Sequence, residues 1–290
     1  MVKRKDVSDA AVKLGIKSDD VLLVHSSLKS FGVVEGGADT VIDGLLDALS
    51  PSGTLVMPAL VQKNFSDAYK TWNKLTSPSD VGLITETFRK REGVVRSDQA
   101  THSVCAYGKL KEFITSEHSS SKPRMHPYGD YAFSHGSPWQ KMYDLGAKIL
   151  FIGVGLEANT FHHFAEAVFA EEIINLIPKD KKEEILAPLV TFETRDLHTA
   201  QLIRERDEHI PHTLIRFQFG RRRTRNRSFE NCEKKEVFCG NSRFLLINAK
   251  EYVDLLLEEI KTYTDEFYTN DVIKLIAKIK ATNEEKSNGN

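Results

Sequence analysis

The chain has 290 residues, of which 40% are hydrophobic, 9% aromatic and 28% charged. This composition is typical of a folded globular protein and excludes a fibrous or largely disordered chain. The 40 basic and 41 acidic residues leave a net charge of -1, so no overall field favours nucleic acid or an anionic membrane as the partner. Length permits one large domain or two small ones, and we expect one.

The N-terminal segment MVKRKDVSDAAVKLGI has no apolar signal-peptide core, and no apolar run reaches the roughly 18 residues that span a bilayer. We therefore expect a cytoplasmic protein without membrane contact. The three cysteines, Cys105, Cys232 and Cys239, are interpreted as reduced thiols, because the CEKKEVFC spacing lacks a second ligand pair for zinc.

The N-terminal part predicts a strand–helix–strand unit. Residues 6–17 fit a short helix, and DDVLLVHSS at 19–27 fits a buried strand. A second strand is predicted from Thr54 to Pro58, after a Pro-Ser-Gly turn. Between the two strands, apolar residues recur at helical spacing, namely Val41, Leu45, Leu46 and Leu49.

The rest of the chain continues this alternation. AKILFIGVGL at 147–156 predicts another strand, so an α/β sheet with its working loops at the strand ends is expected. A long polar stretch at about 60–140, with a helix near 82–92, is typical of functional loops. SRFLLINAKEYVDLLLEEIKTY predicts a strand followed by an amphipathic helix, and ATNEEKSNGN at 281–290 predicts a disordered tail.

One candidate site is VHSSLKSFGVVEGGADT, where a strand ends and a helix begins. Hydroxyls, a lysine and backbone amides near Gly36 and Gly37 suit a phosphate at the helix N-terminus. Small polar residues also serve as ordinary turn and cap residues, so this alternative stays open.

A second candidate is VRSDQATHSVCAYG at 95–108. The backbone of Ser103, Val104 and Cys105 could pair with an extended ligand, as a free strand edge would. The alternative is a loop that returns into a buried strand.

The third candidate is GVGLEANTFHHFAE at 153–166. His163 and Glu166 are three residues apart and share one helix face, whereas His162 points about 100° away. A zinc site is not favoured, because the i, i+4 histidine pair is missing. An imidazole held by a carboxylate is the usual general base near neutral pH. A partly solvated helix start, capped by Asn159 or Thr160, is the alternative.

Several long motifs occur in one order: VHSSLKSFGVVEGGADTVIDGLLDALSPSGTLVMP, RSDQATHSVCAYG, HGSPWQKMYDLGAKILFIGVGLEANTFHHFAE and AKEYVDLLLEEI. In this order and spacing the chain resembles the aminoglycoside 3-N-acetyltransferase family, over about residues 1–170 and again over about 238–260. The resemblance implies a single α/β domain with a central mixed sheet flanked by helices, unrelated to the GNAT acetyltransferases. It also implies acetyl-CoA as the co-substrate and an amine of an aminoglycoside-like molecule as the acceptor.

The resemblance further implies site residues. His163 would be the histidine of an N-T-x-x-H-x-x-E signature and the general base, with Glu166 as its partner. The acceptor amine must lose a proton to become a nucleophile, and no acyl-enzyme is required. No metal is expected, and a homodimer is one possible assembly. The expected CoA channel is lined by His25, Ser26, Ser27, Leu28, Lys29, Ser30, Phe31 and Gly32 on one side and by Ser103, Val104 and Cys105 on the other.

Two departures from the family pattern stand out. Gln99 and Ala100 occupy the positions of a His-Pro pair in the usual H-P-T-H-S motif. The segment at about 190–237 does not align with the family, and its RFQFGRRRTRNR run holds six arginines in twelve residues. A solvated basic loop, a compensated reading-frame error and an anion or nucleic-acid contact are the alternatives, with nucleic acid the least expected. Because the closely spaced arginines have no carboxylate near them in the sequence, they are expected to be unpaired and exposed, and residues 212–236 are expected to lack stable regular structure.

The expected organisation is an acetyltransferase domain over 1–265, with 190–237 atypical, followed by a C-terminal helix and tail over 266–290. The alternative function is a catalytically impaired CoA-binding homologue with an altered acceptor pocket.

Overall fold

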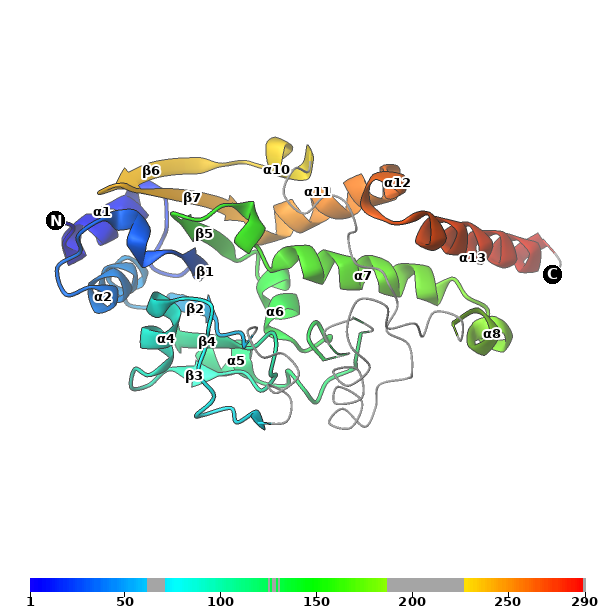
Figure 1. Ribbon diagram of the computed structural model, residues 1–290, viewed down its shortest axis with the longest axis horizontal. Coiled ribbons are helices and arrows are strands. Elements are labelled where there is room, and N and C mark those ends of the chain that lie inside the picture. The colour runs from blue at the N-terminus through cyan, green and yellow to red at the C-terminus, as the bar shows by residue number, and fades with distance from the viewer. Residues whose placement is uncertain (62–70, 125, 127–128, 130, 187–226, 289–290) are drawn as a thin grey trace.

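The computed structural model describes residues 1–61, 71–124, 126, 129, 131–186 and 227–288 (Figure 1). Within these residues, strands form one seven-stranded sheet in the order β3-β4-β2-β1-β5-β7-β6. The strands are β1 (Val21–Ser26), β2 (Thr54–Pro58), β3 (Val95–Arg96), β4 (Val104–Gly108), β5 (Lys148–Ile152), β6 (Lys235–Cys239) and β7 (Ser242–Asn248).

The centre of the sheet is parallel and both edges are antiparallel. Strand β1 pairs in parallel with β2 on one side and with β5 on the other. Strand β4 pairs antiparallel with β2 and β3, and β7 pairs antiparallel with β5 and β6. The predicted α/β fold with a central mixed sheet is therefore confirmed.

Helices cover both faces of this sheet (Figure 1). Helices α1, α2 and α4 pack on one face, and α6, α7, α11 and α13 pack on the other. The helices and 3-10 turns are α1 (Arg4–Lys13), η1 (Leu28–Phe31), α2 (Ala38–Leu49), α4 (Leu83–Arg89), α5 (Lys111–Thr115), α6 (Pro138–Asp144), η2 (Leu156–Ala158), α7 (Phe161–Asn175), η3 (Lys179–Lys181), α8 (Lys182–Leu186), α10 (Arg227–Asn231), α11 (Ala249–Thr262), α12 (Thr264–Phe267) and α13 (Asn270–Asn288).

Strand periodicity divides the core into two layers. In β1, Leu22 and Val24 belong to the cluster beneath α1 and α2, whereas Leu23 belongs to the cluster beneath α7. Successive side chains of a strand point to opposite faces, so an uninterrupted apolar strand needs cover on both sides. The VLLV run of β1 is buried along its whole length for this reason.

This topology fixes where a ligand can bind. The chain leaves β1 toward β2 on one side, and β5 joins the sheet on the other side of β1. Neighbouring connections diverge at such a switch point and leave a crevice beyond the carboxyl ends of the parallel strands. Those ends are Ser26, Pro58 and Ile152.

Two predictions about element ends are wrong. The first helix ends at Lys13 and not at residue 17, because the chain turns at Gly15 with a φ of 86°. Helix α13 continues to Asn288, where the sequence predicted a disordered tail from residue 281. Its Val272, Ile276 and Ile279 are buried in the core, which anchors the helix.

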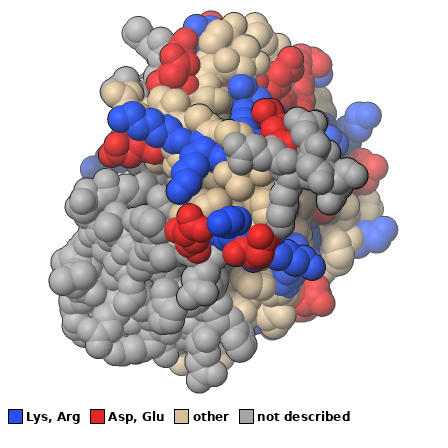
Figure 2. All heavy atoms as spheres, turned by 90° about the vertical axis from the view of Figure 1, so that its right-hand side faces the viewer, with Lys and Arg blue, Asp and Glu red and all other residues tan. Residues whose placement is uncertain are grey.

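In the described part of the chain, no helix combines the length and the hydrophobicity needed to cross a bilayer. On the face shown in Figure 2, acidic and basic side chains of the described residues are interspersed, so neither charge dominates what is visible there.

Candidate active site

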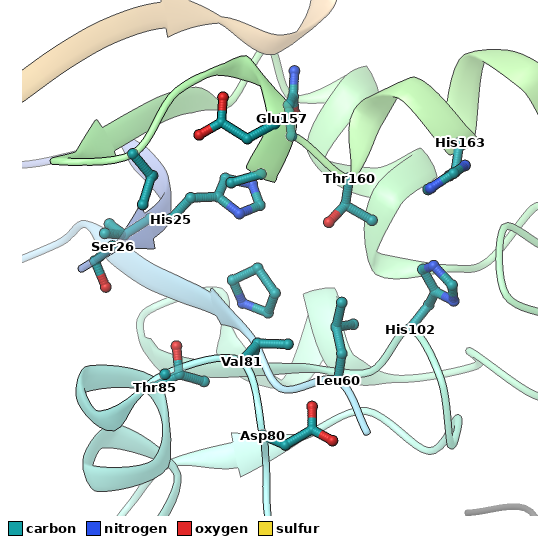
Figure 3. A pocket seen from close by; sticks show the side chains of 16 residues that line it. His25, Ser26, Leu60, Asp80, Val81, Thr85, His102, Glu157, Thr160 and His163 are labelled. Atoms are coloured by element: carbon teal, nitrogen blue, oxygen red, sulfur yellow. The ribbon is translucent and has the colours of Figure 1, made fainter. Parts of the chain in front are cut away.

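A cavity of about 520 Å³ opens at the carboxyl ends of the parallel strands. The end of β1, the segment after β2, the turn before β4 and the start of α7 all contribute to its wall (Figure 3). The switch point of the sheet is thus the place where a ligand fits. The lining residues are Val24, His25, Ser26, Pro58, Leu60, Asp80, Val81, Gly82, Thr85, His102, Val154, Glu157, Ala158, Asn159, Thr160 and His163.

His163 and Glu166 form a hydrogen-bonded pair on α7. The Nδ1 atom of His163 lies 2.6 Å from Oε2 of Glu166, and the His163 side chain is 17% exposed at the cavity. A carboxylate can only accept, so Nδ1 carries the hydrogen in the neutral imidazole and Nε2 carries the lone pair. The pair has the arrangement that a general base requires.

Glu166 is fully buried and has a second histidine partner. Its Oε2 atom lies 3.5 Å from Nε2 of His126. Burial raises the pKa of Glu166, but His163 and His126 together lower it well below its usual range. The carboxylate is therefore ionised and stabilises positive charge on the imidazole beside it.

The same three side chains are the one His/Cys/Asp/Glu cluster of metal-binding spacing within the described residues. With metal bonds of about 2.0–2.1 Å, two ligand atoms in a tetrahedral site lie about 3.3 Å apart. The 2.6 Å separation between His163 and Glu166 is shorter. This contact is a hydrogen bond and does not leave room for an ion between the two atoms.

Aromatic rings hold His163 in place. The ring centroids of His102 and His126 lie 6.0 and 5.8 Å from that of His163, both nearly perpendicular to it. Phe133 contacts the rings of both His102 and His126. In Figure 3 His163 and His102 come from opposite walls of the cavity and face one another.

The structure accommodates the glutamine in place of the motif histidine. Oε1 of buried Gln99 accepts hydrogen bonds from the backbone N–H of His102 and from the hydroxyl of Thr101. The indole of Trp139 donates to the carbonyl oxygen of His102 at 3.0 Å. Gln99 thus holds the turn that presents His102 to the cavity.

The predicted CoA segment divides into two parts. His25 and Ser26 line the cavity, and the imidazole of His25 stacks on Phe151 with a centroid distance of 5.5 Å. Burial and the nearby His162 lower the pKa of His25 to about 3, so this imidazole is neutral near pH 7. His162 itself packs against Tyr252, away from the pair formed by His163.

The second part, from Ser27 to Gly32, lies outside the cavity lining. The side chain of Phe31 is in the core against Phe244, and Ser30 Oγ lies 2.7 Å from Ser242 Oγ. A cofactor contact by Ser27, Leu28, Lys29 or Gly32 stays a prediction.

Ser103, Val104 and Cys105 do not form a free strand edge, and the alternative, a loop that returns into a buried strand, is confirmed. A contact between these residues and CoA stays a prediction. Strand β4 has β2 on one side and β3 on the other, so its backbone groups are paired within the sheet. All three side chains are fully buried, and Ser103 Oγ donates to the carbonyl of Ala59. These residues support the wall from behind, whereas the neighbouring His102 reaches the cavity.

Two acidic residues line the cavity, Asp80 and Glu157 (Figure 3), and the carboxylate of Glu157 accepts a hydrogen bond from the backbone N–H of Gly155 at 2.8 Å. The segment that carries Asp80 is tied to the sheet by Arg96. The guanidinium of Arg96 donates to the carbonyls of Ser77 and Ala59 and lies 4.5 Å from the ring centre of Trp72. No Lys or Arg is found among the described residues that line the cavity, so its described wall attracts cations.

Residues 23–261 match the sequence profile of the family described as aminoglycoside 3-N-acetyltransferase. The chain belongs to this family. It is 33% identical over 184 residues to aminoglycoside N(3)-acetyltransferase III of Salmonella sp, a match that covers 58% of this chain and 61% of that protein. It is 29% identical over 195 residues to the aminoglycoside N(3')-acetyltransferase-like protein YokD of Bacillus subtilis, covering 59% and 68%. At 61%, the first of these matches spans less than two thirds of the length of the Salmonella protein.

Solved structures share the fold. The crystal structure of the aminoglycoside acetyltransferase AAC(3)-IVa superposes with a TM-score of 0.61 at 22% identity, covering 93% of each chain. AAC-IIIb in a binary complex with CoASH gives a TM-score of 0.62 at 18% identity, covering 92% of this chain and 98% of that one.

Sequence reasoning missed several members of the site. His126 and Phe133 fall in a polar stretch without periodicity, and no spacing rule connects them to α7. His102 stood inside a quoted motif but was not assigned a role of its own. Asp80 could be found only once the cavity was located, because nothing in its local sequence separates it from an ordinary turn residue. Asn159 stood in the N-T-x-x-H-x-x-E signature and was a cap candidate, but no role in the site was assigned to it.

Most of the arginine-rich run lies outside the described residues, and Arg227 is its one described member. Residues 212–236 were predicted to lack regular structure, which is wrong for Arg227–Asn231 of α10 and for Lys235 and Glu236 of β6. Arg227 also pairs with Glu266 at 3.1 Å, with its guanidinium carbon 4.1 Å from the ring centre of Tyr263. At this position the expectation of an unpaired arginine is wrong.

Proposed function

We propose that the protein is an acetyl-CoA-dependent N-acetyltransferase that acts on an amine of a cationic, aminoglycoside-like substrate. The observation that carries this proposal is the pair formed by His163 and Glu166 at the mouth of a cavity with acidic walls. Membership of the family and the CoASH complex of a protein with the same fold support it.

The proposed roles follow from geometry. Nε2 of His163 takes a proton from the acceptor amine, because Nδ1 is already bound to Glu166. Glu166 stabilises the imidazolium that results. His25 cannot share the role of base near neutral pH, since its pKa is lowered to about 3 by burial and His162.

Asp80 and Glu157 supply the recognition of a cationic acceptor. Aminoglycosides carry several ammonium groups, and a carboxylate accepts charge-assisted hydrogen bonds from them. The amine to be acetylated must reach His163 while its other ammonium groups contact these carboxylates. The Ser27–Gly32 segment is proposed to contact the cofactor outside the cavity.

Release of thiol from acetyl-CoA, screened against aminoglycosides, simple diamines and neutral amines, tests the proposal. We expect turnover with polycationic acceptors and little with neutral ones. CoA binding is measured in parallel by calorimetry. CoA binding without turnover on any amine would reject the enzyme and support the CoA-binding homologue instead.

A further inference from the structure

Asn159 has a buried amide group whose orientation is fixed. Its Oδ1 atom accepts a hydrogen bond from the backbone N–H of Phe161 at 3.2 Å, so its Nδ2 must point the other way. The residue is 3% exposed, and Nδ2 has no hydrogen-bond partner among the described residues. A buried donor without a partner destabilises the fold, because it has lost its hydrogen bonds to water. Such a cost suggests a function.

The position of Asn159 relates this donor to the chemistry. Asn159 lines the same cavity as His163 and precedes it by four residues, where the chain enters α7. A base and a donor on the wall of one cavity can act on neighbouring atoms of one substrate group.

The charge of the described wall indicates which groups can stabilise negative charge on a substrate oxygen. The described lining contains Asp80 and Glu157 but neither Lys nor Arg. Negative charge that develops on a substrate oxygen must therefore be met by neutral donors. A neutral amide does this without repelling a cationic amine, whereas a lysine in its place would repel it.

We propose that Nδ2 of Asn159 donates a hydrogen bond to the acyl oxygen of the thioester and stabilises the oxyanion of the tetrahedral intermediate. This inference rests on the proposed acetyl transfer. The amine lone pair forms the new N–C bond, the carbonyl π pair moves onto the oxygen at Asn159, and the amine proton moves to His163. Collapse restores the C=O bond and breaks the C–S bond, and His163 returns the proton to the thiolate of CoA.

Two substitutions separate this role from helix capping. Asn159→Asp keeps an oxygen for the N–H of Phe161 but removes the donor, and Asn159→Ala removes both the donor and the cap without adding charge. Loss of one oxyanion donor typically lowers kcat by about 10²–10³-fold. We expect that loss in both variants with the Kd of CoA nearly unchanged, and the melting temperature of Asn159→Asp should stay near that of the wild type.

Asn248 offers a matched control outside the cavity. Its Oδ1 accepts from the N–H of Glu251 at the start of α11, and its Nδ2 donates to the carbonyl of Gly146. Asn248→Asp likewise keeps the cap and loses a donor, so it should lower thermal stability and leave kcat within about threefold.

The outcomes are distinct. If the wild type turns over and kcat is undiminished in Asn159→Ala, the oxyanion role is overturned and the proposed function stands. Loss of kcat in Asn159→Ala but not in Asn159→Asp assigns Asn159 to capping and also overturns the oxyanion role. A wild-type protein that releases no thiol with any amine refutes both the proposed function and this inference.

Discussion

Replacing Glu166 with glutamine removes the buried charge beside His163 while keeping the shape of the side chain. Oε2 of Glu166 lies 2.6 Å from His163 Nδ1, which is the distance of a charge-assisted hydrogen bond once the imidazole is protonated. Such a bond contributes about 1.5–3 kcal/mol. Since 1.36 kcal/mol is a factor of ten in rate, kcat should fall about 10- to 150-fold. The loss should be smaller than that of His163→Ala measured in the same assay.

Glu171 provides the control for loss of a partly buried negative charge from α7. Its carboxylate accepts from Arg124 at 2.7 Å and from His135 at 2.8 Å, outside the cavity lining. Burial raises the pKa of Glu171, but Arg124 and His135 lower it to about 2. Glu171→Gln should therefore lower the melting temperature and leave kcat within about threefold.

The assay is thiol release from acetyl-CoA at saturating amine, with CoA affinity measured by calorimetry. A folded Glu166→Gln variant with wild-type kcat would refute the assignment of Glu166 as the partner of the base. An equal loss of kcat in Glu171→Gln would show that the effect is a general response of α7 and not specific to the pair.

Three further predictions follow from the described contacts. His163→Ala should lower kcat on the order of 100-fold or more with the Kd of CoA nearly unchanged, and of the variants at His162, His163 and Glu166, His162→Ala should lower kcat least. Equal kcat in wild type and His163→Ala would remove His163 from the mechanism. Burial lowers the pKa of His118 to about 4, so its neutral form stabilises the fold above pH 6.5 and this stability is lost as the pH falls from 6.5 toward 4. Denaturant unfolding at pH 7.5 and pH 5 should show that His118→Gln loses about 2 kcal/mol less stability over this range than the wild type, the remaining loss coming from groups such as His25. An equal loss in wild type and His118→Gln would contradict this. Gly153→Ala should lower the free energy of unfolding by about 2 kcal/mol or more, because φ is 62° and the new Cβ would lie 1.9 Å from Ser30 Oγ. In denaturant unfolding the loss should be smaller in a Ser30→Gly background, and equal losses in both backgrounds would exclude the clash.

The features that sequence predicted well are those set by local periodicity. The strand Thr54–Pro58 has the predicted bounds, and the helix with Val41 and Leu45 buries that face. That His163 and Glu166 share a helix face follows from their spacing of three residues, whereas their pairing as base and partner was implied by the family resemblance. Each of these depends on neighbours within one turn or one strand.

The features that sequence missed depend on long-range pairing. Whether β4 is an edge or an interior strand is decided by its hydrogen bonds to β2 and β3, and the local pattern around Cys105 is the same in both cases. His126 is 40 residues away from Glu166 along the chain, and only the packed structure brings them to 3.5 Å. The orphan Nδ2 of Asn159 is likewise a property of its packed surroundings, and the sequence shows only an amide.

The buried carboxylate of Glu259 has a consequence for how this protein can change over evolution. It accepts hydrogen bonds from the backbone N–H groups of Arg227 and Ser228 and from the Ser228 hydroxyl, so α11 fixes the start of α10. A contact made through a backbone N–H does not depend on which side chain the residue carries. Residue 227 can therefore change its side chain while this anchor between α10 and α11 is kept.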